Sequence, residues 1–263
     1  MDPQLFRRLA EAVEQGEEAV LVTVVAVEGA APREPGARML VFSDGRVEGT
    51  VGGGALEQHA VQRALALLRD GPRTLLETHD LRNLGMLCGG RTTLFYEVLV
   101  APPKLFIFGA GHVGALLARL ARATTPWRIV LVDDRPERLQ DLPPGIEGHH
   151  APHYQELPDL KGKVYAVVAT ESHDTDFRVL LKLLREEPGP AYLGMLGSRA
   201  KAAEMREKLR SQGLSPEKVE RVRCPVGLPL GGKDPGAVAL SILAELLAFH
   251  HGRLAEAQAR LSP

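Results

Sequence analysis

Three glycines, Gly109, Gly111 and Gly114, follow a short apolar run and open a stretch with helical periodicity. Their spacing is that of a phosphate-binding turn. The first glycine allows the tight turn, the second lets the backbone approach a phosphate, and the third lets the helix lie close to the sheet. Unpaired N–H groups beside His112, where that helix starts, would face the anion. The alternative is that the glycines serve packing alone.

An acid ends the next apolar run, where Asp133 is followed by Asp134. Roughly 20 residues after such a glycine turn, a carboxylate in dinucleotide-binding units accepts hydrogen bonds from a ribose. The strand, turn, helix, strand and acid together predict a nucleotide-binding βαβ unit over residues 105–134.

A second glycine-rich loop occupies residues 50–54, between a predicted strand and a predicted helix. Its peptide N–H groups could form a nest for an anion, with the helix dipole behind it. Arg33 and Arg38 are candidate charges for the same anion. The alternative is an ordinary tight turn made by its three glycines, which are Gly52, Gly53 and Gly54.

A third glycine loop carries a thiol, because Cys88 precedes Gly89 and Gly90. Thiolates beside helix termini or arginines can bind a soft metal or carry sulfur, which makes Cys88 a candidate catalytic residue. The alternative is a small buried apolar residue. Zinc-ligand spacing is absent around His79 and His112, and Cys224 is interpreted as structural.

Two polar loops follow later predicted strands and would lie at the carboxyl edge of a sheet. In residues 169–176, His173 and Asp176 are candidates for proton transfer or for contact with a bound group. The alternative there is a helix cap from Ser172 or Asp174. Ser198 and Arg199, with Lys201, follow the next strand and suit an anion at the same edge.

The elements that position these residues predict an α/β fold. Residues 105–252 should form a Rossmann-like, doubly wound parallel sheet, because apolar strands at 105–108, 129–132, 164–169 and 191–195 alternate with helical patterns that end in a helix over 235–251. Residues 1–100 should form a smaller α+β domain with a hairpin turn at 43–45. The proline-rich residues 101–104 are the predicted linker, and residues 253–263 a polar tail.

Composition narrows the class of protein. Among 263 residues, 32 are Lys or Arg and 33 are Asp or Glu, so the chain lacks the basic excess typical of nucleic-acid binding. Apolar runs are too short to span a bilayer and the first residues resemble no signal peptide, so we expect a cytoplasmic protein. Two cysteines are too few for a disulfide scaffold, which agrees with a reducing compartment.

Along nearly its whole length the chain resembles the XdhC/CoxI family of xanthine dehydrogenase accessory proteins. The resemblance rests on ProArgGluProGlyAlaArgMetLeu at 32–40, GlyThrValGlyGlyGlyAlaLeuGlu at 49–57, MetLeuCysGlyGly at 86–90, PheGlyAlaGlyHisValGly at 108–114, ValAspAspArgProGlu at 132–137, TyrLeuGlyMetLeuGlySerArg at 192–199, ProValGlyLeu at 225–228 and SerIleLeuAlaGluLeu at 241–246. The chain departs from the family pattern at Ala31, Ala55, Glu171 and Ser172, which leaves Cys88 as the only motif thiol.

The resemblance implies a chaperone that binds molybdenum cofactor, as molybdopterin or its dinucleotide form, rather than a catalyst with its own turnover. It implies help with cofactor sulfuration and insertion, hence two partners: a xanthine dehydrogenase-type enzyme and a sulfur-donating desulfurase. Cys88 becomes a candidate molybdenum contact, and a homodimer is expected. The candidate cofactor-binding residues are Arg33, Arg38, Gly52, Gly53, Gly54, Cys88, Gly89, Gly90, Gly109, Gly111, His112, Gly114, Asp133, Ser198 and Arg199.

Two other functions remain open. The glycine turn with Asp133 would also suit an NAD(P)-dependent oxidoreductase, in which His173 donates a proton to a small carbonyl substrate. A nucleotide-sensing module without catalysis would use the same turn.

Overall fold

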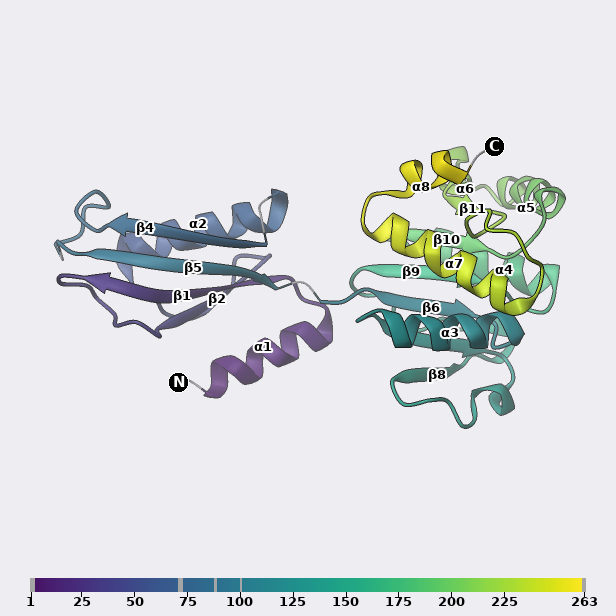
Figure 1. The fold of residues 1–263 in the computed structure, drawn as a ribbon, viewed down its shortest axis with the longest axis horizontal. Helices are drawn as coiled ribbons and strands as arrows, with labels where there is room; N and C mark the ends of the chain where they lie inside the picture. The colour runs from purple at the N-terminus through teal and green to yellow at the C-terminus, as the bar shows by residue number, and fades with distance from the viewer. Residues whose placement is uncertain (1–2, 71–72, 88, 100, 262–263) are drawn as a thin grey trace. The chain divides into compact units, whose positions relative to one another are not determined.

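The computed structural model describes residues 3–70, 73–87, 89–99 and 101–261, and the chain forms two compact units, residues 1–101 and 102–263. Figure 1 shows the fold of both units. Among the described residues, no helix has the length and apolar content needed to cross a bilayer.

The N-terminal unit is built on an antiparallel sheet in the order β3-β2-β1-β5-β4. Its elements are α1 (Pro3–Gln15), β1 (Ala19–Glu28), β2 (Arg38–Phe42), β3 (Val47–Gly49), α2 (Gly54–Asp70), β4 (Thr74–Asp80) and β5 (Arg91–Leu99). The alternation of side chains along a strand gives each helix its own face of this sheet. Val20, Val22 and Leu94 pack against α2, whereas Ala19 and Leu21 belong to the cluster that includes Leu5 of α1.

The C-terminal unit is built on a sheet in which every neighbouring pair of strands is parallel, in the order β8-β7-β6-β9-β10-β11. The strands are β6 (Lys104–Phe108), β7 (Arg128–Asp133), β8 (Ile146–His150), β9 (Val164–Val168), β10 (Tyr192–Met195) and β11 (Val222–Arg223). Counted along the unit, this is the order 3-2-1-4-5-6 of doubly wound dinucleotide-binding folds, whose ligands bind at the carboxyl ends of strands 1 and 4. Here those strands are β6 and β9.

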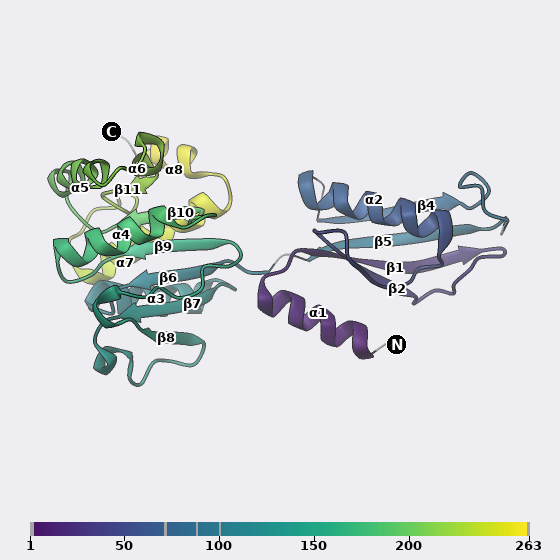
Figure 2. The same ribbon diagram turned by 180° about the vertical axis from the view of Figure 1, so that it is seen from behind.

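Helices cover both faces of the parallel sheet, so its strands are almost continuously apolar. Helices α3 (His112–Thr124) and α7 (Pro235–His250) pack on the face that presents Leu105 and Ile107. Helices α4 (His173–Arg185) and α5 (Arg199–Ser211) pack on the face that presents Phe106 and Phe108. Figure 1 views the side of α3 and α7, and Figure 2 the side of α4.

The predicted fold class is confirmed: a Rossmann-like parallel sheet follows a smaller unit with an antiparallel sheet. Several elements were not predicted, among them β8, α8 (Leu254–Leu261), the short strand β11 and helix α6 (Pro216–Glu220). Residues 146–150 form the edge strand β8. The expected polar tail after Gly252 instead contains helix α8, which buries Leu254. The short helix α6 leads into β11.

Candidate functional site

The glycine turn at the end of β6 has the tight turn at Gly109 and the close helix packing at Gly114 that its spacing predicts. Gly109 has a φ of +108°, and a Cβ there would lie 2.2 Å from the Ala169 carbonyl oxygen. A Cβ on Gly114 would lie 1.9 Å from the Gly109 carbonyl oxygen, so this glycine is required for the helix to lie close to the turn. Gly111, the N-cap residue of α3, has no such neighbour, since the nearest atom to its Cβ position is 3.8 Å away. The backbone is therefore open to a ligand at Gly111.

Asp133 ends β7 as predicted, but its carboxylate holds the glycine turn rather than pointing into solvent. Oδ2 accepts a hydrogen bond of 2.6 Å from the Ala110 N–H, and Oδ1 accepts one of 3.0 Å from the Arg135 N–H. The Asp133 side chain is 1% exposed. Burial and the Asp133 charge raise the pKa of Asp134 above its usual value. The acid that was expected to bind a ribose thus has both oxygens engaged by the backbone.

Two arginines that follow β7 complete this end of the sheet. Arg138, in the 3-10 turn η1 (Pro136–Leu139), places Nη1 3.7 Å from Asp133 Oδ2 and 3.8 Å from the Cβ position of Gly111. Arg135 forms an ion pair with Glu171, which follows β9. Because β6 lies between β7 and β9, this pair spans the carboxyl end of β6. The positive end of α3 and the Arg138 guanidinium together suit an anionic group at Gly111.

The loop after β9 is used largely for structure. Ser172 caps α4 through a reciprocal pair of hydrogen bonds with Thr175, as in the alternative interpretation of this loop. Asp176 is 1% exposed and accepts hydrogen bonds from the backbone N–H of Thr170 at 3.0 Å and from Lys201 Nζ at 2.6 Å. His173, in contrast, is exposed in the first turn of α4.

The loop after β10 leads into α5, and its hydroxyl is also a helix cap. Ser198 Oγ accepts a hydrogen bond of 3.2 Å from the Lys201 N–H, and Arg199 is exposed beside it. Cys224 follows β11 at this same edge. Its thiol lies 3.8 Å from the Ser198 carbonyl oxygen, and burial raises its pKa, so the neutral thiol is favoured.

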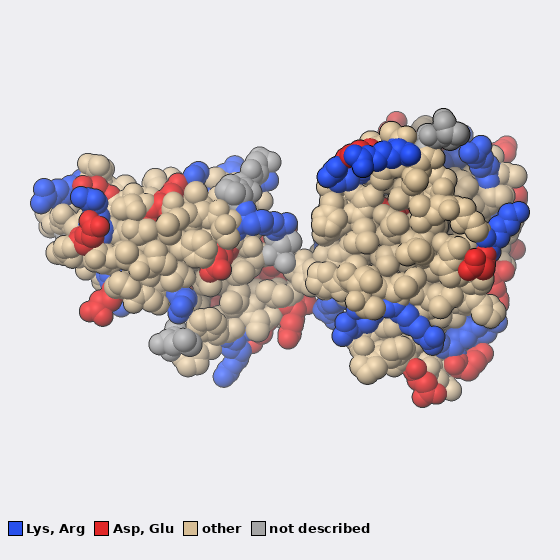
Figure 3. All heavy atoms as spheres, viewed as in Figure 1, with Lys and Arg blue, Asp and Glu red and all other residues tan. Residues whose placement is uncertain are grey.

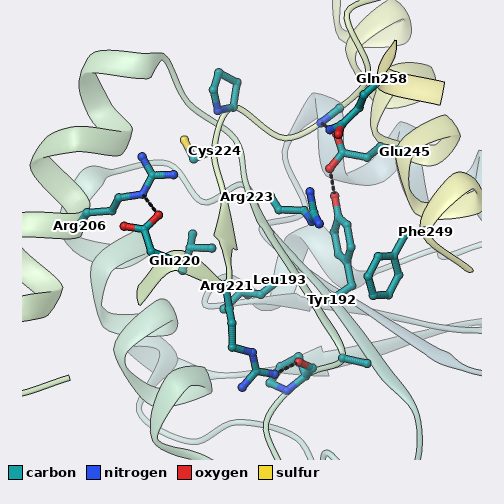
Figure 4. Close-up of a pocket in the computed structure, with 15 residues that line it drawn as sticks. Tyr192, Leu193, Arg206, Glu220, Arg221, Arg223, Cys224, Glu245, Phe249 and Gln258 are labelled. Atoms are coloured by element: carbon teal, nitrogen blue, oxygen red, sulfur yellow. Dashed lines mark hydrogen bonds and ion pairs between the residues drawn. The ribbon is translucent and has the colours of Figure 1, made fainter. Parts of the chain in front are cut away.

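A cavity of about 430 Å³ lies beside β11, and Figure 4 shows the side chains around it. Tyr192 donates a hydrogen bond of 2.6 Å to Glu245 Oε1, and the Gly227 N–H donates one of 3.0 Å to Oε2. Burial, followed by the Glu245 charge, raises the pKa of Tyr192. The guanidinium of Arg223 lies 5.8 Å from the Tyr192 ring centre. Tyr192 and Glu245 satisfy one another here, so this pair needs no ligand.

In the N-terminal unit the structure brings the three sequence motifs together at one end of the sheet. A Cβ on Gly52 would lie 2.5 Å from Pro32 Cγ, so the triple-glycine turn packs on the loop between β1 and β2. Gly90 donates its N–H to the Ala30 carbonyl of that same loop at 3.1 Å. A Cβ on Gly89 would lie 2.6 Å from Arg82 Nε. Cys88 lies outside the described residues.

The triple-glycine turn does form an anion nest, and the anion in it is the Glu57 carboxylate. Burial raises the pKa of Glu57, but hydrogen bonds from the Thr50 hydroxyl and from the N–H groups of residues 51–53 lower it to a net value below the usual one. Gly53 and Gly54 have positive φ angles of 75° and 62°, which produce this turn. The Gly52 N–H also donates a hydrogen bond of 3.2 Å to Thr50 Oγ1, so this peptide group of the turn is already paired.

Arg33 and Arg38 line a common cavity of about 230 Å³ with Thr50 and Phe6. The guanidinium of Arg38 lies 5.3 Å from the centre of the Phe6 ring, whereas Arg33 is exposed. The two arginines therefore remain near the triple-glycine turn, as expected from the sequence.

Positive charge gathers on one face of the C-terminal unit. Figure 3 shows a band of basic side chains at the place of α3 in Figure 1. Arg119 and Arg122 of this helix are exposed. A field of this sign attracts anionic ligands to the helix whose N-terminus is open at Gly111.

Three residues that lie at the candidate sites were not predicted from the sequence: Glu57, Arg135 and Arg138. Glu57 carried a signal, since a glutamate three residues into a helix is typical of N-terminal capping. The two arginines gave none beyond their position after the second strand, because the direction of a long side chain depends on tertiary packing.

A parallel sheet in this strand order, with a glycine turn after its first strand, defines the C-terminal unit as a Rossmann-type domain. The model of the XdhC Rossmann domain matches residues 105–246, and that of the XdhC and CoxI family matches residues 12–79. The chain belongs to the XdhC and CoxI family, which confirms the resemblance seen in its motifs.

Two relatives come from Escherichia coli (strain K12). The uncharacterised protein YqeB is 32% identical over 92% of this chain, which spans 46% of YqeB and so about half of its length. The molybdenum cofactor insertion chaperone PaoD is 30% identical over 92% of this chain and 86% of PaoD. A crystal structure described as a xanthine dehydrogenase from Bacillus halodurans has the same fold, with a TM-score of 0.50, 20% identity, and coverage of 94% of this chain and 96% of that one.

Proposed function

We propose that this protein binds molybdenum cofactor and assists its insertion into a xanthine dehydrogenase-type molybdenum hydroxylase. The observation that carries the proposal is the 30% identity to the insertion chaperone PaoD over 92% of this chain. A match of that extent includes residues from both units, whereas a similarity of Rossmann domains alone would be confined to the second.

The C-terminal unit offers a place for the phosphate or dinucleotide tail of such a cofactor. At Gly111 the backbone is open, the first turn of α3 presents N–H groups, and the Arg138 guanidinium lies 3.8 Å from the Cβ position. Exposed His112 begins that turn. A phosphate bound there would replace water around groups of opposite charge.

Other candidate residues for cofactor binding lie in the N-terminal unit. The loops that carry Arg33 and Gly89 are held together through Ala30 and Gly90, so the motif residues form one surface. We propose that Cys88, adjacent to that surface in sequence, contacts the molybdenum or carries the sulfur to be transferred. A desulfurase as sulfur donor and a homodimer complete the proposal.

The strand order also suits an NAD(P)-dependent oxidoreductase or a nucleotide-sensing module. Asp133 argues against the first of these, because a ribose hydroxyl would have to displace the Ala110 N–H from its carboxylate. A sensor that uses only the phosphate site at Gly111 does not meet this difficulty.

The test is to incubate the protein anaerobically with molybdenum cofactor and, separately, with NAD, and to isolate each mixture by gel filtration. Molybdenum, pterin and nucleotide are then measured per chain. We expect molybdenum and pterin to be retained in equal amounts. Arg138→Gln should weaken retention about tenfold or more, because a charged hydrogen bond contributes about 1.5–3 kcal/mol. Lys161→Gln, an exposed loop substitution in the same unit, is the matched control.

Cys88→Ala divides the proposal further. Loss of molybdenum with retention of pterin would place the thiol at the metal, and unchanged retention of both would remove Cys88 from the site. Retention of NAD without pterin would favour the oxidoreductase or the sensor, and retention of neither ligand would overturn all three.

A further inference from the structure

Three side chains with metal-binding atoms converge at the edge of the N-terminal sheet. Glu77 and His79 are two residues apart on the edge strand β4, so they point to the same face, and His59 reaches them from α2. One ligand atom from each residue lies within 4.8 Å of those of the other two. His79 Nε2 is 3.9 Å from Glu77 Oε2, and the two imidazole ring centres are 4.8 Å apart.

Buried polar atoms without partners gather at the same place. In the described parts of the chain, seven buried side-chain N or O atoms have no hydrogen-bond partner, and five of them lie on α2, β4 and β5. Thr92 faces His79 directly across the strand pair, and Tyr96 faces Leu75 on the same side. The five atoms are Arg63 Nε, Glu77 Oε2, His79 Nε2, Thr92 Oγ1 and Tyr96 Oη. Such a concentration marks a place where water or an ion completes the structure.

His79 is the most enclosed of the three residues. Its side chain is 10% exposed, and its Nε2 atom has no hydrogen-bond partner among the described residues. An ion pair between His79 and Glu77, whose atoms lie 3.9 Å apart, would not account for the second histidine, His59, beside them.

Arg63 accounts for only part of this cluster. Its Nη2 lies 2.8 Å from Glu77 Oε1, which neutralises the carboxylate but leaves Oε2, the oxygen nearer His79, unpaired. An ordinary ion pair at the rim of the core would explain Glu77 and Arg63. It would not explain why two histidines lie beside that carboxylate.

We propose that His59, Glu77 and His79 bind a divalent transition metal ion such as Zn²⁺. Two imidazole nitrogens and a carboxylate oxygen are a common three-ligand set, which leaves a fourth position open. Tetrahedral bonds of about 2.1 Å require ligand atoms about 3.4 Å apart, so the widest pair must approach by about 1.4 Å. His59 is exposed, so the ion can reach the site from solvent.

This site is independent of the proposed function, because none of its ligands belongs to the motifs that carry the cofactor proposal. Sequence spacing did not predict it, since residues 59, 77 and 79 match no metal-binding pattern and are brought together only by the packing of α2 on β4.

The test is calorimetric titration of the metal-free full-length protein with Zn²⁺ under reducing conditions, with bound zinc measured after gel filtration. We expect one ion per chain, and a thermal midpoint that rises with Zn²⁺. His59→Ala and His79→Ala should each weaken binding at least tenfold, since loss of even an outer-layer partner costs about 10–100-fold. His251→Ala, an exposed histidine of the other unit, should bind as the unchanged protein does.

Cys88→Ser separates this site from the cofactor proposal, because zinc bound through the thiol would be lost in that variant and retained in His59→Ala. If His79→Ala fails to fold, the exposed His59 still provides the decisive variant. No stoichiometric binding, or binding that is unchanged in His59→Ala and Glu77→Gln, would overturn the proposal.

Discussion

Glu57 determines the role of the triple-glycine turn, because its carboxylate accepts the N–H groups of residues 51–53 and the Thr50 hydroxyl. The pattern Gly-Gly-Gly between a strand and a helix predicts a turn that has positive φ angles and no side chains. The pattern does not predict which anion fills this nest, because the answer depends on how the first turn of α2 packs against the nest. The roles of Gly109 and Gly114 could likewise be predicted from the spacing of the glycines. The direction of the Asp133 side chain, toward the glycine turn, could not.

Replacing Glu57 by Gln should make the protein less stable near neutral pH by about 1–3 kcal/mol, since hydrogen bonds to a charged acceptor are lost. The pKa of Glu57 is lowered from 4.5 in the folded state, so its contribution is complete above that value and is lost as the pH falls further. The difference between the two proteins should therefore shrink below about pH 4.5. Urea unfolding across a pH series measures it.

The control for this series is Glu11→Gln, an exposed substitution on α1, which should change stability by less than about 0.5 kcal/mol at any pH. A constant difference for Glu57→Gln from pH 7 to pH 3 would show that the carboxylate is not held by the turn.

Among the elements, α4 and α5 are joined at their first turns by the buried pair Asp176 and Lys201, whose side chains are 1% and 15% exposed. From the sequence, helices were expected between several of the strands, but no bounds were predicted for α4 or α5. Elements with little burial were not predicted: β8 has one buried residue in five and lies at a sheet edge, and α8 buries only Leu254. Their sequences are polar because few of their side chains enter a core.

Breaking this pair from one side should cost about 3–5 kcal/mol of stability, because it leaves a buried charge without its partner. Asp176→Asn and Lys201→Met should each show such a loss, and the double variant should lose less than the sum of the two. A double-mutant cycle by chemical unfolding measures this coupling. Strict additivity would mean that the 2.6 Å contact contributes little in solution.

At the scale of the whole molecule, each hydrophobic cluster draws its residues from one unit alone. Leu94→Ala should therefore reduce the stability of the N-terminal unit by about 2–5 kcal/mol and act within that unit. Hydrogen exchange followed by mass spectrometry should show lost protection in β1 and β5, with β6 to β10 unchanged. Leu131→Ala is the matched control, and it should give the reverse pattern. Equal loss in both units from either variant would show that they unfold together.

The ion pair between Arg135 and Glu171 would have to separate before a ligand could bind Arg135 at the end of β6, so the charge of that ligand matters. The pair is partly exposed, at 33% and 50%, and so is weak enough to be separated. A neutral ligand would gain no ionic interaction by separating Arg135 from Glu171, and a monoanion would only replace one carboxylate with another single charge. A phosphate dianion has more charge and several oxygens that match the planar guanidinium. It would therefore compete with Glu171 for Arg135 better than a neutral or singly charged ligand would. If the phosphate of the proposed cofactor binds at this strand end, its charge should therefore favour it over neutral or singly charged ligands.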